Sequence, residues 1–251
     1  MTSEKRVWIT GAGKGIGRAV ALKLVEDGWR VAASARTRAD LDALERDAPA
    51  GGIVGYPLDV TDIEATRRVV EDMERTLGLP DTVILNAGTH RPTPADNFSI
   101  TDVRALVETN LMGTANGLAE IMPRFMARGS GHIAVVASLA GYRGLPTSAG
   151  YGASKAALIN MCEALKPELD KHGVTLTLIN PGFVKTPLTD KNTFPMPFLI
   201  SAEEAAARIV RGLSATAFEV TFPTRFAWLM KGLRALPDRL FFAVTRRMID
   251  P

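Results

Sequence analysis

Four glycines separate the first apolar segment of this chain from a helical pattern. Arg6–Thr10 predicts a short strand, and Gly11, Gly13, Gly15 and Gly17 follow it. Apolar residues from Ile16 to Val25 then recur at helical spacing, and Asp27-Gly28 is expected to end that helix. Glycines in such a turn let the backbone approach a pyrophosphate, whose charge the helix N-terminus binds. The motif alone also fits a plain glycine turn.

The rest of the chain alternates between apolar runs and helical patterns. This alternation predicts an α/β fold, a Rossmann-type doubly wound parallel sheet of about seven strands with helices on both faces. At 251 residues the chain has the length of one such domain, residues 1–222, with an amphipathic extension of the same domain at 223–251. Further strands are expected at Arg30–Ser34, Ile53–Leu58, Thr82–Leu85, Ile133–Ser138, Val174–Ile179 and Phe218–Phe222, and further helices at 38–47, 62–77, 101–127, 151–171 and 201–213.

Composition excludes several classes of protein. Hydrophobic residues at 46% and charged residues at 23% are ordinary globular values, and a net charge of +3 does not argue for a nucleic-acid partner. The single cysteine, Cys162, cannot form an internal disulfide or a cysteine-based metal site, and we expect no metal. No segment approaches the roughly 18 apolar residues of a membrane span. Val7 begins an apolar strand too early for a signal peptide, so we expect a cytoplasmic protein.

Several short motifs follow the glycines along the sequence. Only Tyr151 among the three tyrosines has a lysine four residues on, Lys155, and Ser138 lies thirteen residues before Tyr151. Together the motifs resemble the short-chain dehydrogenase/reductase family over about residues 5–222, with Leu85 as a mild departure where that family often has asparagine. The other matching elements are Thr10-Gly-x-x-x-Gly-x-Gly17, Asn86-Ala-Gly88, Asn110, Pro181-Gly182 and Thr186.

The chemistry of the Tyr–Lys pair follows from its spacing. Tyr151 and Lys155 share one face of a helix, and a nearby ammonium is expected to lower the tyrosine pKa from about 10 toward a range useful for proton transfer. Ser138 would donate a hydrogen bond to the substrate oxygen. The resemblance implies that Lys155 also binds the nicotinamide ribose and that Asn110 holds a water that relays protons. Taken singly, each residue also fits a purely structural role.

Cofactor choice is predicted from two cations. The second expected strand lacks the carboxylate that binds the ribose of NAD. Arg36, just beyond the end of that strand, and Lys14, in the glycine turn, resemble positions that bind the 2′-phosphate of NADP. We therefore expect NADP(H), with solvated surface charges as the alternative interpretation. The resemblance implies cofactor contacts from Gly11, Gly13, Lys14, Gly15, Ile16, Gly17, Arg36, Asp59, Val60, Asn86, Ala87, Gly88, Tyr151, Lys155, Pro181, Gly182, Val184 and Thr186.

Two segments bear on the substrate. Residues 183–200 resemble the family's substrate lid, and their apolar side chains, Phe194, Met196, Phe198 and Leu199, suggest a hydrophobic carbonyl or alcohol. Packing on the protein's own core explains them equally well. Arg91, after His90, either binds an anionic group or, as we expect, faces solvent.

The C-terminal segment departs from the usual family ending. From Phe222 to Pro251 it holds six Lys/Arg and two Asp/Glu, and it predicts two amphipathic helices around a proline break. Contact with an anionic membrane, a cover for the substrate pocket and a subunit interface all remain open. The resemblance implies a homodimer through 101–127 and 151–171.

The function expected is an NADP(H)-dependent oxidoreductase acting on a carbonyl or alcohol. A non-catalytic NADP-binding regulator is the alternative, since fold does not determine function. A membrane-surface scaffold has only the C-terminal segment to support it. An epimerase is disfavoured because the chain lacks residues for an added substrate domain.

Overall fold

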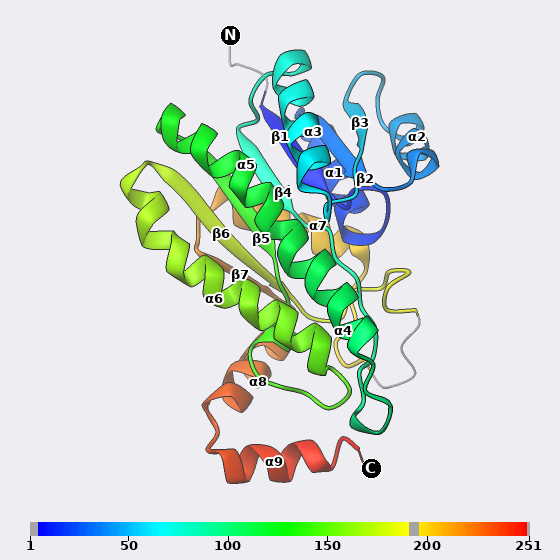
Figure 1. Cartoon of the computed structure of the whole chain (residues 1–251), viewed down its shortest axis with the longest axis vertical. Coiled ribbons are helices and arrows are strands. Elements are labelled where there is room, and N and C mark those ends of the chain that lie inside the picture. Colours follow the sequence, from blue (N-terminus) through cyan, green and yellow to red (C-terminus); the bar gives the residue numbers. More distant parts are fainter. Residues whose placement is uncertain (1–4, 191–195, 250–251) are drawn as a thin grey trace.

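Seven parallel strands form one sheet in the computed structural model, which describes residues 5–190 and 196–249 (Figure 1). Their order is β3-β2-β1-β4-β5-β6-β7. The predicted strands are all present, with ends that differ by a few residues: Ser138 lies two residues beyond its strand, and β6 continues to Pro181. The bounds are β1 Arg6–Thr10, β2 Arg30–Ala35, β3 Ile53–Pro57, β4 Thr82–Leu85, β5 Gly131–Val136, β6 Val174–Pro181 and β7 Glu219–Phe222.

Helices cover both faces of the sheet, as the alternating pattern predicts. One core contains apolar side chains of α1, α2 and α7, and α1 packs against α7. The other contains those of α3, α5 and α6, with α5 and α6 crossing in front of the sheet in Figure 1. The bounds are α1 Gly15–Glu26, α2 Arg38–Asp47, α3 Ile63–Thr76, α4 Ile100–Leu106, α5 Gly113–Arg128, α6 Ala149–Lys171 and α7 Ala202–Ser214.

The helix expected over 101–127 is not continuous. A π-helical segment, Val107–Met112, separates α4 from α5. Such a segment inserts an extra residue into the helix and re-aims neighbouring side chains, often at functional sites. Asn110 lies in this segment and is fully buried.

Strand order places a crevice at the carboxyl end of the sheet. The chain moves outward from β1 to β2 and β3, then returns to pair β4 on the opposite side of β1. Ligands of doubly wound folds bind at this reversal, because the connections leaving the two central strands diverge there. Thr10, the last residue of β1, is in register with Ser34 and Leu85.

Two further helices, α8 (Thr224–Ala235) and α9 (Asp238–Arg246), follow the sheet. They confirm the two helices predicted around a proline break, and Pro237 is that break. Buried α8 side chains join the main core, whereas α9 lies at the lower end of the molecule in Figure 1. Arg143 ties the two together: its guanidinium donates to the carbonyls of Leu233 and Leu236 and pairs with Asp238.

Candidate active site

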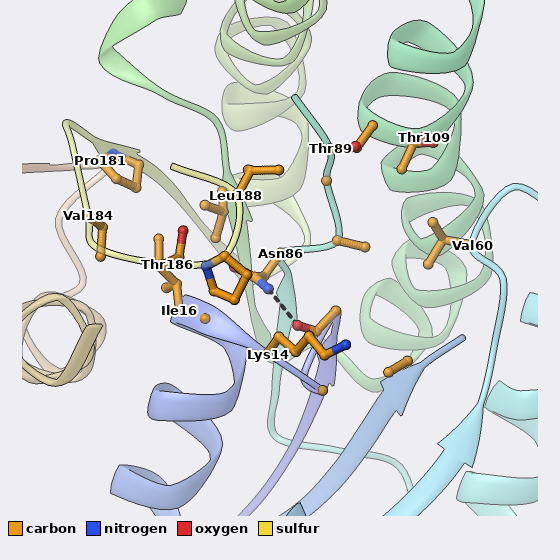
Figure 2. Close-up of a pocket in the computed structure, with 18 of the residues that line it drawn as sticks. Lys14, Ile16, Val60, Asn86, Thr89, Thr109, Pro181, Val184, Thr186 and Leu188 are labelled. Atoms are coloured by element: carbon orange, nitrogen blue, oxygen red, sulfur yellow. Dashed lines mark hydrogen bonds between the residues drawn. The ribbon is translucent and has the colours of Figure 1, made fainter. Parts of the chain in front are cut away.

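A cavity of about 460 Å³ opens at the carboxyl end of the strands (Figure 2). The structure brings almost all of the predicted site residues to it; Gly17 and Asn110 are the two that do not line the wall. The predicted residues that line it are Gly11, Gly13, Lys14, Gly15, Ile16, Arg36, Asp59, Val60, Asn86, Ala87, Gly88, Ser138, Tyr151, Lys155, Pro181, Gly182, Val184 and Thr186.

The glycine turn needs its glycines for space as well as conformation. Gly11 has a φ of +66°, which disfavours other residues, and a Cβ there would lie 2.8 Å from Ala87 Cα. A Cβ on Gly17 would lie 2.4 Å from the carbonyl oxygen of Gly11. Although Gly17 does not line the cavity, its lack of a side chain lets α1 begin directly behind the turn.

Asn86, the residue that follows β4, forms hydrogen bonds with this turn. Its Nδ2 donates to the carbonyl oxygens of Thr10 and Gly11, at 3.0 and 3.2 Å, and Figure 2 shows its side chain pointing at the turn. The backbone N–H groups of Asn86 and Ala87 both donate to Thr10 Oγ1. The Asn-Ala-Gly element therefore has a structural role that sequence reasoning missed: it locks the glycine turn to the neighbouring strand.

The electrostatics of the turn suit an anionic dinucleotide. No acidic residue occupies the first turn of α1, and the cationic Lys14 is its N-cap residue, so the positive end of the helix dipole faces the cavity uncompensated. Arg36 lines the rim and is exposed. Lys14 pairs with Asp40 at 3.1 Å. The residues present therefore fit the phosphates of a nicotinamide dinucleotide.

The predicted catalytic side chains converge on the opposite wall. Ser138 begins a short 3-10 turn after β5, and its Oγ accepts the N–H of Ala140 at 3.1 Å. Tyr151 is in the first turn of α6, and Lys155 follows one turn later. Lys155 Nζ donates to the carbonyl of Val136 at 2.8 Å and lies 5.9 Å from the centre of the Tyr151 ring.

Burial is the largest influence on the pKa values of Tyr151 and Lys155. Desolvation raises the pKa of Tyr151, and a hydrogen bond with Ser138 only partly opposes it. The expected net lowering of the tyrosine pKa by Lys155 is therefore wrong for the structure described, because the cost of burying a phenolate exceeds the favourable interactions available to it. Desolvation also lowers the pKa of Lys155 to about 8.

Asn110 lies behind the cavity wall, and both its amide oxygen and its amide nitrogen form hydrogen bonds. Its Oδ1 accepts the N–H of Thr89 at 2.7 Å, and its Nδ2 donates to Thr89 O and Ser154 Oγ, both at 3.0 Å. A side chain on Gly88 would meet Asn110 Oδ1 at 3.3 Å and Lys155 Nζ at 3.5 Å. The π-helical segment thus holds the loop after β4 against α6.

The loop that carries His90 and Arg91 borders Tyr151. The His90 ring meets that of Tyr151 edge-on, with centres 4.8 Å apart, and burial lowers the pKa of His90. Arg91 pairs with Asp102 at the surface, which confirms the expectation that it faces solvent.

The predicted lid is only partly described. Phe194 lies outside the described residues, and Phe198 and Leu199 are both exposed rather than packed into the core. Phe183 stacks on Phe226 of α8, with ring centres 5.4 Å apart, so the C-terminal extension contacts this segment.

Sequence reasoning missed several cavity-lining residues. Asp40 approaches from α2, and only tertiary packing brings it to Lys14, so no spacing in the sequence marks it. Thr89 directly follows Asn86-Ala-Gly88, and that adjacency could have revealed it. In the described ranges, 5–190 and 196–249, no group of His, Cys, Asp and Glu is arranged to hold a metal.

Comparison with known proteins gives the family. The sequence model of the short chain dehydrogenases matches residues 5–195. An oxidoreductase of Myxococcus xanthus is 39% identical over 248 residues, which are 98% of either chain. An oxidoreductase of Staphylococcus haemolyticus is 32% identical over 82% of this chain and 89% of its own. This chain belongs to the short-chain dehydrogenase family and is an oxidoreductase of that family.

Solved structures agree with this assignment. A short-chain dehydrogenase from Streptomyces avermitilis superposes with a TM-score of 0.81 at 25% identity, covering 92% of both chains. Levodione reductase gives a TM-score of 0.77 at 26% identity, over 86% of this chain and 94% of its own. ElxO with bound NADP is similar in fold, with a TM-score of 0.77 at 23% identity, over 87% of this chain and 97% of its own.

Proposed function

We propose that this protein is an NADP(H)-dependent oxidoreductase that interconverts a carbonyl and an alcohol. One observation carries the proposal: Ser138, Tyr151 and Lys155 line the same cavity as the glycine turn. A pure NADP sensor would have no use for a half-buried phenol beside a buried ammonium at that cavity, because burying an ammonium costs stability. This argues against the non-catalytic regulator.

The proposed roles follow from what each side chain can donate. NADPH, when bound, supplies the hydride to the carbonyl carbon. Ser138 Oγ donates a hydrogen bond to the substrate oxygen as negative charge develops there. Tyr151 then transfers its proton to that oxygen, and its raised pKa suits an acid that is still protonated at neutral pH. In alcohol oxidation the same proton moves the other way.

Lys155 and Asn110 support this transfer. Because Lys155 has a pKa of about 8, it is mostly protonated at pH 7 and provides a positive charge beside the phenol and a donor for the nicotinamide ribose. Asn110 acts as a positioning residue, since its amide bonds hold the loop of Thr89 in place. The relay water assigned to Asn110 stays a prediction, supported by its position against Gly88 beside Lys155.

NADP preference is supported by two cations at the cavity. Lys14 and Arg36 both line the cavity and would bind a 2′-phosphate, and β2 carries no carboxylate to bind a ribose hydroxyl. Charge-assisted bonds are worth about 1.5–3 kcal/mol each, so even one favours NADPH by roughly tenfold or more. Asp40 partly neutralises Lys14, which makes Arg36 the more important of the two. The NADP bound by ElxO agrees with this choice.

An apolar substrate and a homodimer complete the proposal. Phe183 and Phe198 flank Phe226 near the lid, and this apolar wall suits a hydrophobic carbonyl.

Exposed alanines of α6, Ala153 and Ala156, leave room for a second copy to pack closely. Residues 223–251 would be an extension of the domain formed by 1–222, since α8 side chains belong to the same core.

NADPH oxidation against a panel of aldehydes, ketones, quinones and ketosteroids tests the proposal. Tyr151→Phe removes the proton donor and is expected to lower kcat roughly 10²–10⁴-fold while leaving the NADPH dissociation constant unchanged. Turnover that survives in the variant would refute the role of Tyr151. Tight NADPH binding with no turnover across the panel in either direction would favour the regulator.

A further inference from the structure

Exposed apolar side chains concentrate at one end of the molecule. Trp228 is 71% exposed on α8, and Phe242 is 55% exposed on α9. Phe98 and Phe198, from loops at the carboxyl end of the sheet, and Ile100, at the start of α4, are also exposed. Figure 1 shows α9 at this same end. Monomeric proteins rarely expose so many large apolar groups together without a partner.

Helix α9 carries apolar groups along both sides of its buried face. Phe241 and Thr245 are buried against the body of the protein. On one side, Leu240 and Val244 stand exposed one turn apart. On the other side, Phe242 helps to line a hollow of about 300 Å³, together with Leu145, Pro146, Arg246 and Ile249. Apolar groups therefore extend outward beyond the face that α9 uses for packing.

The cations of the extension are concentrated on its free surface. Arg225, Arg239, Arg246 and Arg247 are all exposed, and none forms an ion pair with any residue in the described part of the chain. Asp238, the one carboxylate of the extension within that part, is paired with Arg143. The free surface is thus positively charged as well as apolar.

We propose that α8 and α9 dock this protein on an anionic lipid membrane. Trp, Phe and Leu side chains bury into the boundary between headgroups and acyl chains, while the arginines contact lipid phosphates. A second copy of this chain fits less well, because an isologous interface would set the unpaired arginines of two identical patches against one another. In the described part of the chain no helix meets the length and apolarity needed to cross a bilayer, so the contact would be peripheral.

Docking in this way would place the cavity close to the lipid. Phe226 lies on the inner face of α8 and stacks on Phe183, which follows Gly182 at the cavity wall. A hydrophobic substrate could then reach the site from the bilayer. The docking itself does not depend on the proposed reaction, because it requires no turnover.

Sedimentation with lipid vesicles tests the proposal on the full-length protein. We expect binding to vesicles of equal parts phosphatidylcholine and phosphatidylglycerol, weaker binding as salt is added, and little binding to phosphatidylcholine alone. Arg239→Gln with Arg247→Gln is expected to lower the partition coefficient about 30-fold, since each arginine near an anionic surface contributes about fivefold. Trp228→Ser should weaken binding independently, with a loss of the blue shift in tryptophan fluorescence.

The matched control removes two exposed cations far from this surface. Arg46→Gln with Lys171→Gln changes net charge equally, at the ends of α2 and α6. An equal loss of binding in this control would overturn the proposal, as would no binding at low salt or equal binding to neutral vesicles. Sedimentation velocity without lipid provides a further arm. If the arginine and Trp228 variants dissociate a dimer and leave vesicle binding intact, a second copy covers the surface and the proposal fails.

Discussion

The burial of Lys155 makes folding stability depend on pH in a predictable direction. The pKa of this lysine is about 8 in the folded protein, against about 10.5 when it is exposed in the unfolded chain. Between these values the unfolded state binds more protons, so stability rises with pH. The gain is absent below about pH 8 and complete above about pH 10.5. From pH 7 to 9.5 it amounts to about 2 kcal/mol.

Replacing the lysine isolates this contribution. Urea unfolding at pH 7 and at pH 9.5 measures the free energy of unfolding of the original protein and of Lys155→Met. The difference between the two proteins should change by about 2 kcal/mol between the two pH values, with the original protein gaining relative to the variant at high pH. Contributions from all other titrating groups cancel in this comparison.

A matched variant shows whether the change belongs to the buried site. Lys171→Met removes a positive charge from the exposed end of the same helix. If the Lys155→Met difference is the same at both pH values, or changes no more than in Lys171→Met, the lysine does not titrate as its burial requires. The reasoning on its charge at neutral pH would then be refuted.

Two further predictions concern the cofactor and the frame of the site. Arg36→Ser should lower kcat/KM with NADPH roughly 10–100-fold and leave kcat/KM with NADH unchanged. Arg38→Ser is the control, because the Arg38 guanidinium pairs with Asp42. An equal loss with both cofactors in Arg36→Ser would contradict the 2′-phosphate role. Asn110→Ala removes three hydrogen bonds made by a fully buried side chain and should lower the free energy of unfolding by about 2–4 kcal/mol in thermal or urea unfolding. A cost below about 1 kcal/mol would show that the loop of Thr89 is held by other contacts.

Local sequence patterns were enough to predict the architecture. Runs such as Ile133–Val136 are apolar throughout, as is typical of strands in a sheet covered on both faces, and the helices between the strands have one apolar face. Glycines at Gly11 and Gly17 indicate a close approach of two backbones, which the structure shows as contacts with Ala87 and within the turn itself. The proline between α8 and α9 likewise marks a helix boundary by its own chemistry.

The interruption between α4 and α5 could not be predicted in this way. Residues 101–127 have a helical pattern that does not mark the break. The π-helical segment carries Asn110, whose hydrogen-bond partners Thr89 and Ser154 are distant in sequence. The pKa of Tyr151 is a similar case. The spacing of Tyr151 and Lys155 placed a charge beside the phenol, but how much water reaches the phenol depends on every element packed around it.

The order of residue types along the chain therefore determined the fold class, the family and many of the side chains at the cavity, because periodicity, glycine positions and motif spacing are local properties. Only the tertiary structure decided how those side chains are solvated and paired. Asp40 meets Lys14 across two elements, Asn86 braces the glycine turn across two strands, and the arginines of α9 stay free because no carboxylate in the described part of the chain packs against them. Solvation and pairing depend on distances in space, which the spacing of residues along a chain does not specify.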